Sequence, residues 1–193
     1  MKYDSSKHHR RSIRLKGYDY SQAGAYFVTI CINQGLHTLG EIRNSRMYPS
    51  QSGEMVQTVW DELPLHYPGV AVDAFVLMPN HVHGIIVLQA VTTGVGATTG
   101  GLPLRTGDCP PKPMTLGDVV HRFKSLTTAK YRHGVIKLGW KPFPKQFWQR
   151  NYYESIIRDE QSWNTIRGYI LNNPVAWECE SLHLEKYHLH PNV

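Results

Sequence analysis

Two apolar runs near the middle of the chain constrain its fold more than any other segment. Residues 70–78 (VAVDAFVLM) and 81–89 (HVHGIIVLQ) are rich in branched aliphatic side chains, and Pro79-Asn80 separates them. Short apolar runs joined by turn-forming residues are typical of antiparallel strands. The sequence therefore predicts a sheet in which these two strands are neighbours.

Two histidines, His81 and His83, open the second of these strands. Because successive side chains of a strand alternate between its faces, both imidazoles share one face, about 7 Å apart along the strand. They can hold one divalent ion and leave room for a third ligand and for substrate oxygens, which is typical of a catalytic metal site. A second pair, His188 and His190, lies in a polar segment beside Pro191, and we interpret it as solvated tail.

The remaining patterns complete an alternating order of strands and helices. We expect further strands over residues 25–33 and 147–157, a helix capped by Ser52 and ending near His66, a helix capped by Thr115, and a last helix that starts at Asp159 or Ser162 and ends at Pro174. The first six elements form a ferredoxin-like β-α-β-β-α-β unit of an α+β protein. The last helix is an addition that can bring its side chains to the sheet.

The composition is that of one globular domain. The 193 residues are 41% hydrophobic and 19% charged, which is typical of a folded chain. We expect one domain over residues 25–178, with a basic arm before it (1–24), a flexible Gly/Pro-rich insertion within it (90–113) and a His-rich tail after it (179–193). The net charge of +6 favours an anionic partner, but many soluble proteins are equally basic.

The sequence also carries signals about its compartment. Its first residues lack the apolar core of a signal peptide, and no apolar run approaches the roughly 18 residues of a membrane span. The three cysteines, Cys31, Cys109 and Cys179, are scattered, which argues against a disulfide framework. We therefore expect a cytoplasmic protein with no membrane partner.

The last expected helix carries a second pair of chemically useful side chains. Tyr169 and Asn173 are four residues apart and so lie on one helix face, one turn apart. Pro174 disfavours helical geometry at Asn173, which places that residue at the helix end. A tyrosine beside Ile166 and Ile170 is usually core, and an asparagine before proline is usually a helix stop. The helix pattern alone therefore leaves structural and functional interpretations open.

Five short motifs in a fixed order add a family resemblance. They cover residues 12–20 (SIRLKGYDY), 26–30 (YFVTI), 78–83 (MPNHVH), 148–153 (WQRNYY) and 169–174 (YILNNP). With this ordered set the chain resembles the REP-associated tyrosine transposases, in the single-tyrosine branch of the HUH endonucleases. The resemblance implies nicking and rejoining of single-stranded DNA beside a hairpin, in a nucleoid-associated bacterial protein. Some relatives exchange the tyrosine helix between subunits, so the resemblance allows a homodimer as well as a monomer.

The resemblance also assigns roles at the site. Tyr169 corresponds to the nucleophile, and Asn173 joins His81 and His83 as a ligand of Mg²⁺ or Mn²⁺. Because imidazole is not a favoured ligand of Mg²⁺, we expect Mn²⁺ to bind more tightly. Attack by Tyr169 on the scissile phosphate would leave a 5′-phosphotyrosine and a free 3′-hydroxyl. A free tyrosine has a pKa near 10, so the ion or a nearby base must assist its deprotonation.

Cationic and aromatic side chains supply the expected DNA contacts. These are Arg10, Arg11, Arg14 and Lys16 of the arm, Arg122 and Lys124 of the second helix, and Trp148 and Arg150 before the last strand. A solvated arm, a solvated helix face and a core role for Trp148 or its neighbour Phe147 remain open. Tyr152 and Tyr153 are rival nucleophiles, ranked lower because no histidine or carboxylate cluster lies near them in sequence.

Two other functions remain as alternatives. A domesticated, catalytically silent relative would bind hairpin DNA or RNA without cutting it, although loss of Tyr169 or of a histidine would signal this and all are present. A generic ferredoxin-like RNA-binding module is the other, but its RNP aromatic pattern is absent. We expect neither the 90–113 insertion nor the sequence after Pro174 to touch the catalytic set.

Overall fold

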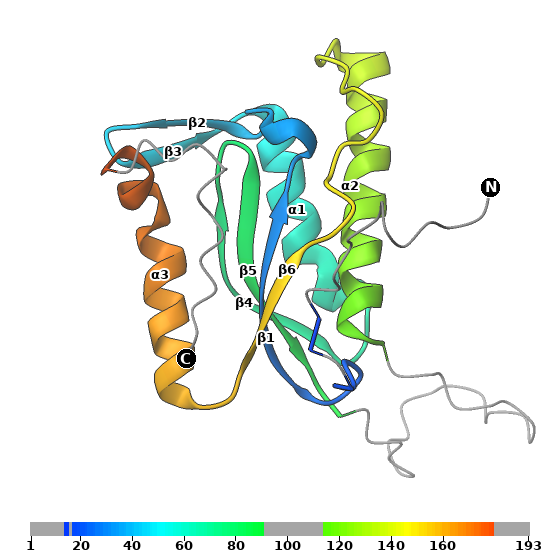
Figure 1. Cartoon of the computed structure of the whole chain (residues 1–193). Helices are drawn as coiled ribbons and strands as arrows, with labels where there is room; N and C mark the ends of the chain where they lie inside the picture. The colour runs from blue at the N-terminus through cyan, green and yellow to red at the C-terminus, as the bar shows by residue number, and fades with distance from the viewer. Residues whose placement is uncertain (1–13, 16, 91–113, 180–193) are drawn as a thin grey trace, which may run out of the picture.

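A four-stranded antiparallel sheet forms the centre of the computed structural model, which describes residues 14–15, 17–90 and 114–179 (Figure 1). From edge to edge its strands are β4 (Val70–Leu77), β5 (His81–Leu88), β1 (Gly24–Cys31) and β6 (Tyr153–Ile157). All neighbouring pairs are antiparallel. This order confirms the α+β, ferredoxin-like arrangement, since the first and third strands of the unit lie at the centre and the second and fourth at the edges.

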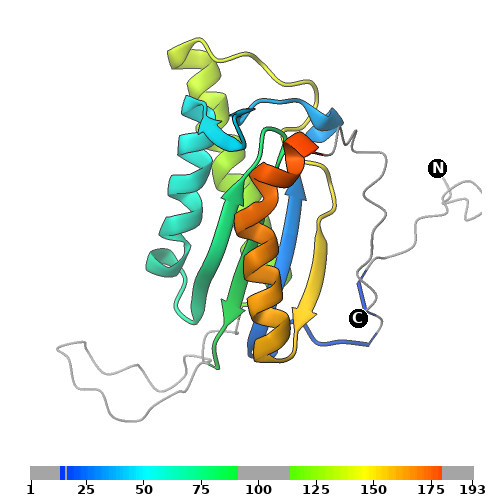
Figure 2. The ribbon, with the colours of Figure 1, turned by 90° about the vertical axis from the view of Figure 1, so that its left-hand side faces the viewer.

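Helices cover both faces of this sheet. The helices α1 (Gln51–His66) and α2 (Leu116–Leu138) pack together on one face, and α3 (Glu160–Cys179) packs on the other (Figures 1 and 2). Figure 2 shows α3 lying in front of the strands. Every position of β5 except Val87 is buried, because this central strand is covered from both sides.

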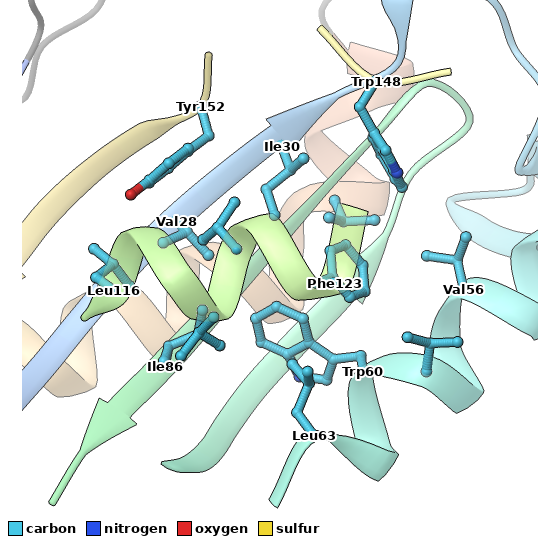
Figure 3. Close-up of a cluster of buried hydrophobic side chains, with 14 of the residues drawn as sticks. Val28, Ile30, Val56, Trp60, Leu63, Ile86, Leu116, Phe123, Trp148 and Tyr152 are labelled. Atoms are coloured by element: carbon cyan, nitrogen blue, oxygen red, sulfur yellow. The ribbon is translucent and has the colours of Figure 1, made fainter. Parts of the chain in front are cut away.

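The larger core lies between the sheet and α1 and α2. Figure 3 shows Trp60 of α1 beside Phe123 of α2, with Ile86 of the sheet in the same cluster, and the two aromatic rings are 5.6 Å apart at their centroids. Gly84 lets Trp60 approach β5, because a Cβ at that position would lie 2.4 Å from the indole ring. The spacing of apolar residues along both helices therefore fixes which face of each helix packs on the sheet.

The helix starts follow local capping chemistry. Thr115 caps α2 as expected, and it forms a reciprocal capping box with Asp118. The cap expected at Ser52 is two residues too late: Ser50 caps α1 by accepting a hydrogen bond from the Gly53 backbone N–H at 3.1 Å. The hydroxyl of Ser52 instead donates to the carbonyl of Thr38.

Two expected elements differ from the structure. Regular β6 pairing begins only at Tyr153, and the earlier part of the expected strand makes an isolated bridge between Trp148 and Ile32. From Thr29 to Ile32 β1 advances three residues while the facing strand runs five, from Tyr153 back to Trp148, so two extra residues interrupt the ladder. Within this interruption Lys124 donates to the carbonyls of Gln149 and Asn151. The turn region between residues 40 and 49 forms an additional hairpin of β2 (Gly40–Arg43) and β3 (Arg46–Pro49).

The last helix is longer than expected. α3 continues through Pro174 to Cys179, so proline does not end it. Arg10, Arg11, Lys16, the 91–113 part of the insertion and the second histidine pair lie outside the described residues. Within the described part of the chain, no helix is long and apolar enough to cross a membrane.

Candidate active site

The two histidines of β5 converge on the sheet face that α3 covers. His81 and His83 are 3% and 4% exposed, and their Nε2 atoms are 3.0 Å apart. In register, Cys31 of β1 lies opposite His81, and Thr29 lies opposite His83. The shared face expected from strand alternation is therefore confirmed, and rotation of the rings brings two nitrogens together.

Hydrogen bonds to the outer ring nitrogens orient both imidazoles. Asn80 donates its amide N–H to the carbonyl of Gly35 at 3.4 Å, which turns its Oδ1 toward His81 Nδ1 at 2.7 Å. The Oγ1 of Thr29 lies 2.7 Å from Nδ1 of His83 and can accept in the same way. A proton held on each Nδ1 leaves a lone pair on each Nε2, which is how outer partners prepare histidine for a metal ion.

Burial keeps these imidazoles neutral. It lowers the pKa of His81 to about 3, with a smaller contribution from the charge of His37. Burial, and then the neighbouring His81, holds the pKa of His83 well below its ordinary value. The desolvated site disfavours a charged ring, so both side chains present lone pairs at neutral pH. The neutral ring is the form that binds metal.

One face of α3 lies over the histidine pair. Tyr169, Asn173 and Trp177 follow each other at four-residue spacing and form one stripe along the helix. The ring of Tyr169 lies 5.4 Å from that of His83, and the ring of Trp177 lies 5.8 Å from that of His81. Asn173 stands between these two contacts on the stripe and is only 3% exposed.

The amide of Asn173 is held by its own helix. Its Nδ2 donates to the carbonyl of Tyr169 at 3.3 Å, so Oδ1 is the atom that could bind a cation. In the described residues, no cluster of three or more histidine, cysteine or carboxylate side chains could hold a metal ion. The side chains here that could bind an ion are therefore the two imidazoles, which are in contact, and the amide of Asn173 on the helix that covers them.

The ring of Tyr169 is packed against the sheet, and its side chain is also partly open to solvent. Its ring packs edge-on against Phe27 at 5.9 Å and against His83, yet the side chain is 44% exposed. The ring is thus held from the sheet side while part of the residue faces solvent. A hydroxyl in this position can meet a substrate that approaches the histidine pair.

The rival tyrosines point toward opposite faces of the sheet. Tyr152 is buried on the α2 side, accepts a hydrogen bond from Arg14 at 2.7 Å, and burial raises its pKa, which makes it a poor nucleophile. Tyr153 lies opposite Thr29 in register, on the same face as the histidine pair. Two strand spacings separate it from His83, about 10 Å.

The expected DNA contacts are divided between surface and interior. Arg122 and Arg150 are exposed. Lys124 is tied to backbone carbonyls, and burial lowers its pKa to about 8. Trp148 is 4% exposed and donates its indole N–H to Thr127 at 2.8 Å. Because it is packed inside the core, Trp148 has no free ring face for a base, and the core interpretation applies to it.

Arg14 also has a role within the fold. Its guanidinium lies over the ring of Tyr152, with Cζ 4.9 Å from the ring centroid, and its Nε is 3.9 Å from Glu154. These contacts attach the segment before β1 to the edge strand β6. The described part of the basic arm therefore packs on the domain.

Three residues of the site were missed by the sequence reasoning. Thr29 and Asn80 orient the histidines, and Trp177 covers His81. The expectation that nothing after Pro174 touches the catalytic set is wrong, because α3 continues and carries Trp177 to the site. The repeated four-residue spacing from Tyr169 was the available signal.

A solved structure has the same fold. The structure of a REP-associated tyrosine transposase bound to a REP hairpin superposes with a TM-score of 0.54, over 87% of this chain and 76% of that chain, at 18% sequence identity. No model of a known protein family matches the chain. At this identity the likeness shows that the chain has the fold of these transposases.

A relative from Haemophilus influenzae is much closer in sequence. It is an uncharacterized protein, 41% identical over 186 residues, which are 95% of this chain and 98% of the relative. The chain belongs to the same family as this protein.

Proposed function

We propose that this protein nicks and rejoins single-stranded DNA beside a hairpin, with Tyr169 as the nucleophile and a divalent ion held by His81, His83 and Asn173. The observation that carries the proposal is the α3 stripe, which lies against two neutral histidines with Tyr169 at one end. The shared fold with a transposase that binds a REP hairpin supports the substrate class.

The donor set fits a small divalent ion. Two neighbouring ligands of one small divalent ion must lie close together, about 3 Å apart. The Nε2 atoms of His81 and His83 have this separation. Nitrogen donors favour Mn²⁺ over Mg²⁺, and the amide oxygen of Asn173 suits either ion. When bound, the ion would supply Lewis-acid polarisation of a phosphate oxygen.

The protein's own side chains would position the imidazoles and the nucleophile. Asn80 and Thr29 hold the imidazoles in place, and Phe27 and His83 support the ring of Tyr169. Attack by the Tyr169 hydroxyl forms one O–P bond and breaks the bond to the 3′ oxygen. The hydroxyl proton leaves to solvent, and the departing oxygen takes one up. One phosphodiester replaces another, so the reverse step can rejoin strands without ATP.

Covalent capture from a random pool tests this function and selects the target sequence in the same step. A pool of single-stranded oligonucleotides with a hairpin and randomised flanks is incubated with the protein and Mn²⁺, then denatured. We expect protein–DNA adducts that resist denaturant, a restricted set of captured flanks, and no adduct after removal of Mn²⁺ with chelator. His83→Asn should lose the adduct while its melting transition shows a folded protein.

The same experiment separates the enzyme from a silent hairpin-binding protein. A silent binder would retain hairpins on a native gel and give no adduct with any metal. That result would overturn the proposed chemistry and leave DNA binding as the function.

A further inference from the structure

We propose that Tyr153 is a stacking platform for an unpaired nucleobase of the DNA strand that enters the active site. The inference extends the proposed function, because it assigns a binding subsite beside the catalytic residues. Base stacking was expected from the aromatic stretch before the last strand. The structure buries Trp148 of that stretch and leaves the ring of Tyr153 open.

The position of Tyr153 is set by the edge of the sheet. It is the first residue of β6, and its register partner Thr29 is itself paired with His83. Because directly paired side chains point to the same face, Tyr153, Thr29 and His83 form one row across the sheet. The row leads from the open edge of β6 to the histidine pair.

The ring of Tyr153 is not part of the apolar core formed by the described residues. The side chain is 44% exposed and belongs to neither apolar cluster of the described residues. Its neighbour Tyr152 is 7% exposed and packs in the larger cluster. Partially open aromatic side chains beside a nucleic-acid site are suited to stacking, since every base offers a π face.

The length of this row also suits single-stranded DNA. About 10 Å separates Tyr153 from His83, two strand spacings. A phosphate held at the histidine pair would therefore leave a nearby base within reach of the Tyr153 ring. Single-stranded DNA is the occupant that this arrangement favours, because bases in a duplex are already stacked on each other.

Binding to a thymidine homopolymer tests the subsite, because this strand cannot form a hairpin. The probes are an oligonucleotide of about 12 thymidines and an abasic strand of the same length. Tyr153→Ala should weaken thymidine binding about 5- to 150-fold, the equivalent of 1–3 kcal/mol per stacked base. Tyr153→Phe keeps the ring and should bind as the parent does. All three proteins should bind the abasic strand equally.

Tyr48 provides a matched control, since it is 45% exposed but lies on the β2–β3 hairpin, outside the four-stranded sheet. Tyr48→Ala should keep parental affinity for both strands. Parental affinity of Tyr153→Ala, an equal loss on the abasic strand, or a parent that binds neither probe would each overturn the subsite. The binding assay involves no cleavage, so a failure of covalent capture alone rejects the nicking chemistry and leaves the stacking result standing.

Discussion

The two faces of the central sheet are built from the same strands but present different kinds of side chain. On β1, Val28 and Ile30 point toward α1 and α2 and are fully buried, whereas Phe27 and Thr29 point toward α3 and the histidines. The α1/α2 face is an apolar core. The α3 face buries polar groups beside partially open aromatic rings. Strand alternation thus lets one short segment contribute to the apolar core on one side and to the proposed active site on the other.

The largest expected difference between the faces is in stability. Phe123→Ala removes a fully buried ring of the α1/α2 core and should lower the free energy of unfolding by about 3–5 kcal/mol. Phe27→Ala, on the α3 face and only partly buried, should cost clearly less. Urea denaturation of both variants measures this, and equal losses would erase the distinction between the faces.

A matched pair of threonine substitutions sharpens the comparison. Thr29→Val keeps the side-chain shape but removes the hydrogen-bond partner of His83, so Mn²⁺ affinity should fall about 10- to 100-fold. Thr128→Val makes the same change on α2, where the hydroxyl bonds the carbonyl of Lys124, and should leave Mn²⁺ affinity unchanged. Titration with Mn²⁺, followed by electron paramagnetic resonance of the free ion, reports both constants.

The buried histidines should also make stability depend on pH. The pKa of His81 is lowered to about 3 in the folded protein, whereas an unfolded histidine titrates near 6.5. Only the unfolded state takes up this proton between those values, so metal-free stability is complete above about pH 6.5 and declines as pH falls. One unit below 6.5 the loss is about 1.4 kcal/mol for this residue. Urea titrations from pH 7.5 to 5 should show that the free energy of unfolding falls less steeply with pH in His81→Gln than in the parent. The same slope in both proteins would contradict the buried, neutral state of His81.

The smallest expected effect concerns the start of α2. Thr115→Ala removes the capping box and should lower stability by about 1 kcal/mol. Adduct yield at saturating Mn²⁺ should not change, because the cap belongs to the face away from the site. Thermal melting and covalent capture of the same preparation check the two halves of this prediction. A loss of adduct with an intact melt would show that α2 contributes to the chemistry.

The parts of the site that the sequence predicted are those with local signals. Alternation on β5 placed His81 and His83 together, and helical spacing placed Tyr169 and Asn173 on one face. Thr29 depends on the register between β1 and β5, which no local pattern specifies. Trp177 was hidden because Pro174 indicated a helix end that tertiary packing overrides. The late start of β6 coincides with two extra residues in the facing segment and with the bonds of Lys124 to the Gln149 and Asn151 carbonyls, contacts between residues more than twenty positions apart.

The identity of the tyrosine that carries the DNA adduct tests most directly whether the nucleophile lies on the α3 face. Captured adducts are digested, and the modified peptide is sequenced by mass spectrometry for the parent, Tyr169→Phe, Tyr152→Phe and Tyr153→Phe. We predict that the DNA is attached to Tyr169 in the parent and in the Tyr152→Phe and Tyr153→Phe variants, and that Tyr169→Phe forms no adduct while remaining folded. An adduct on Tyr152 or Tyr153, or undiminished capture by Tyr169→Phe, would contradict the assignment of the chemistry to α3.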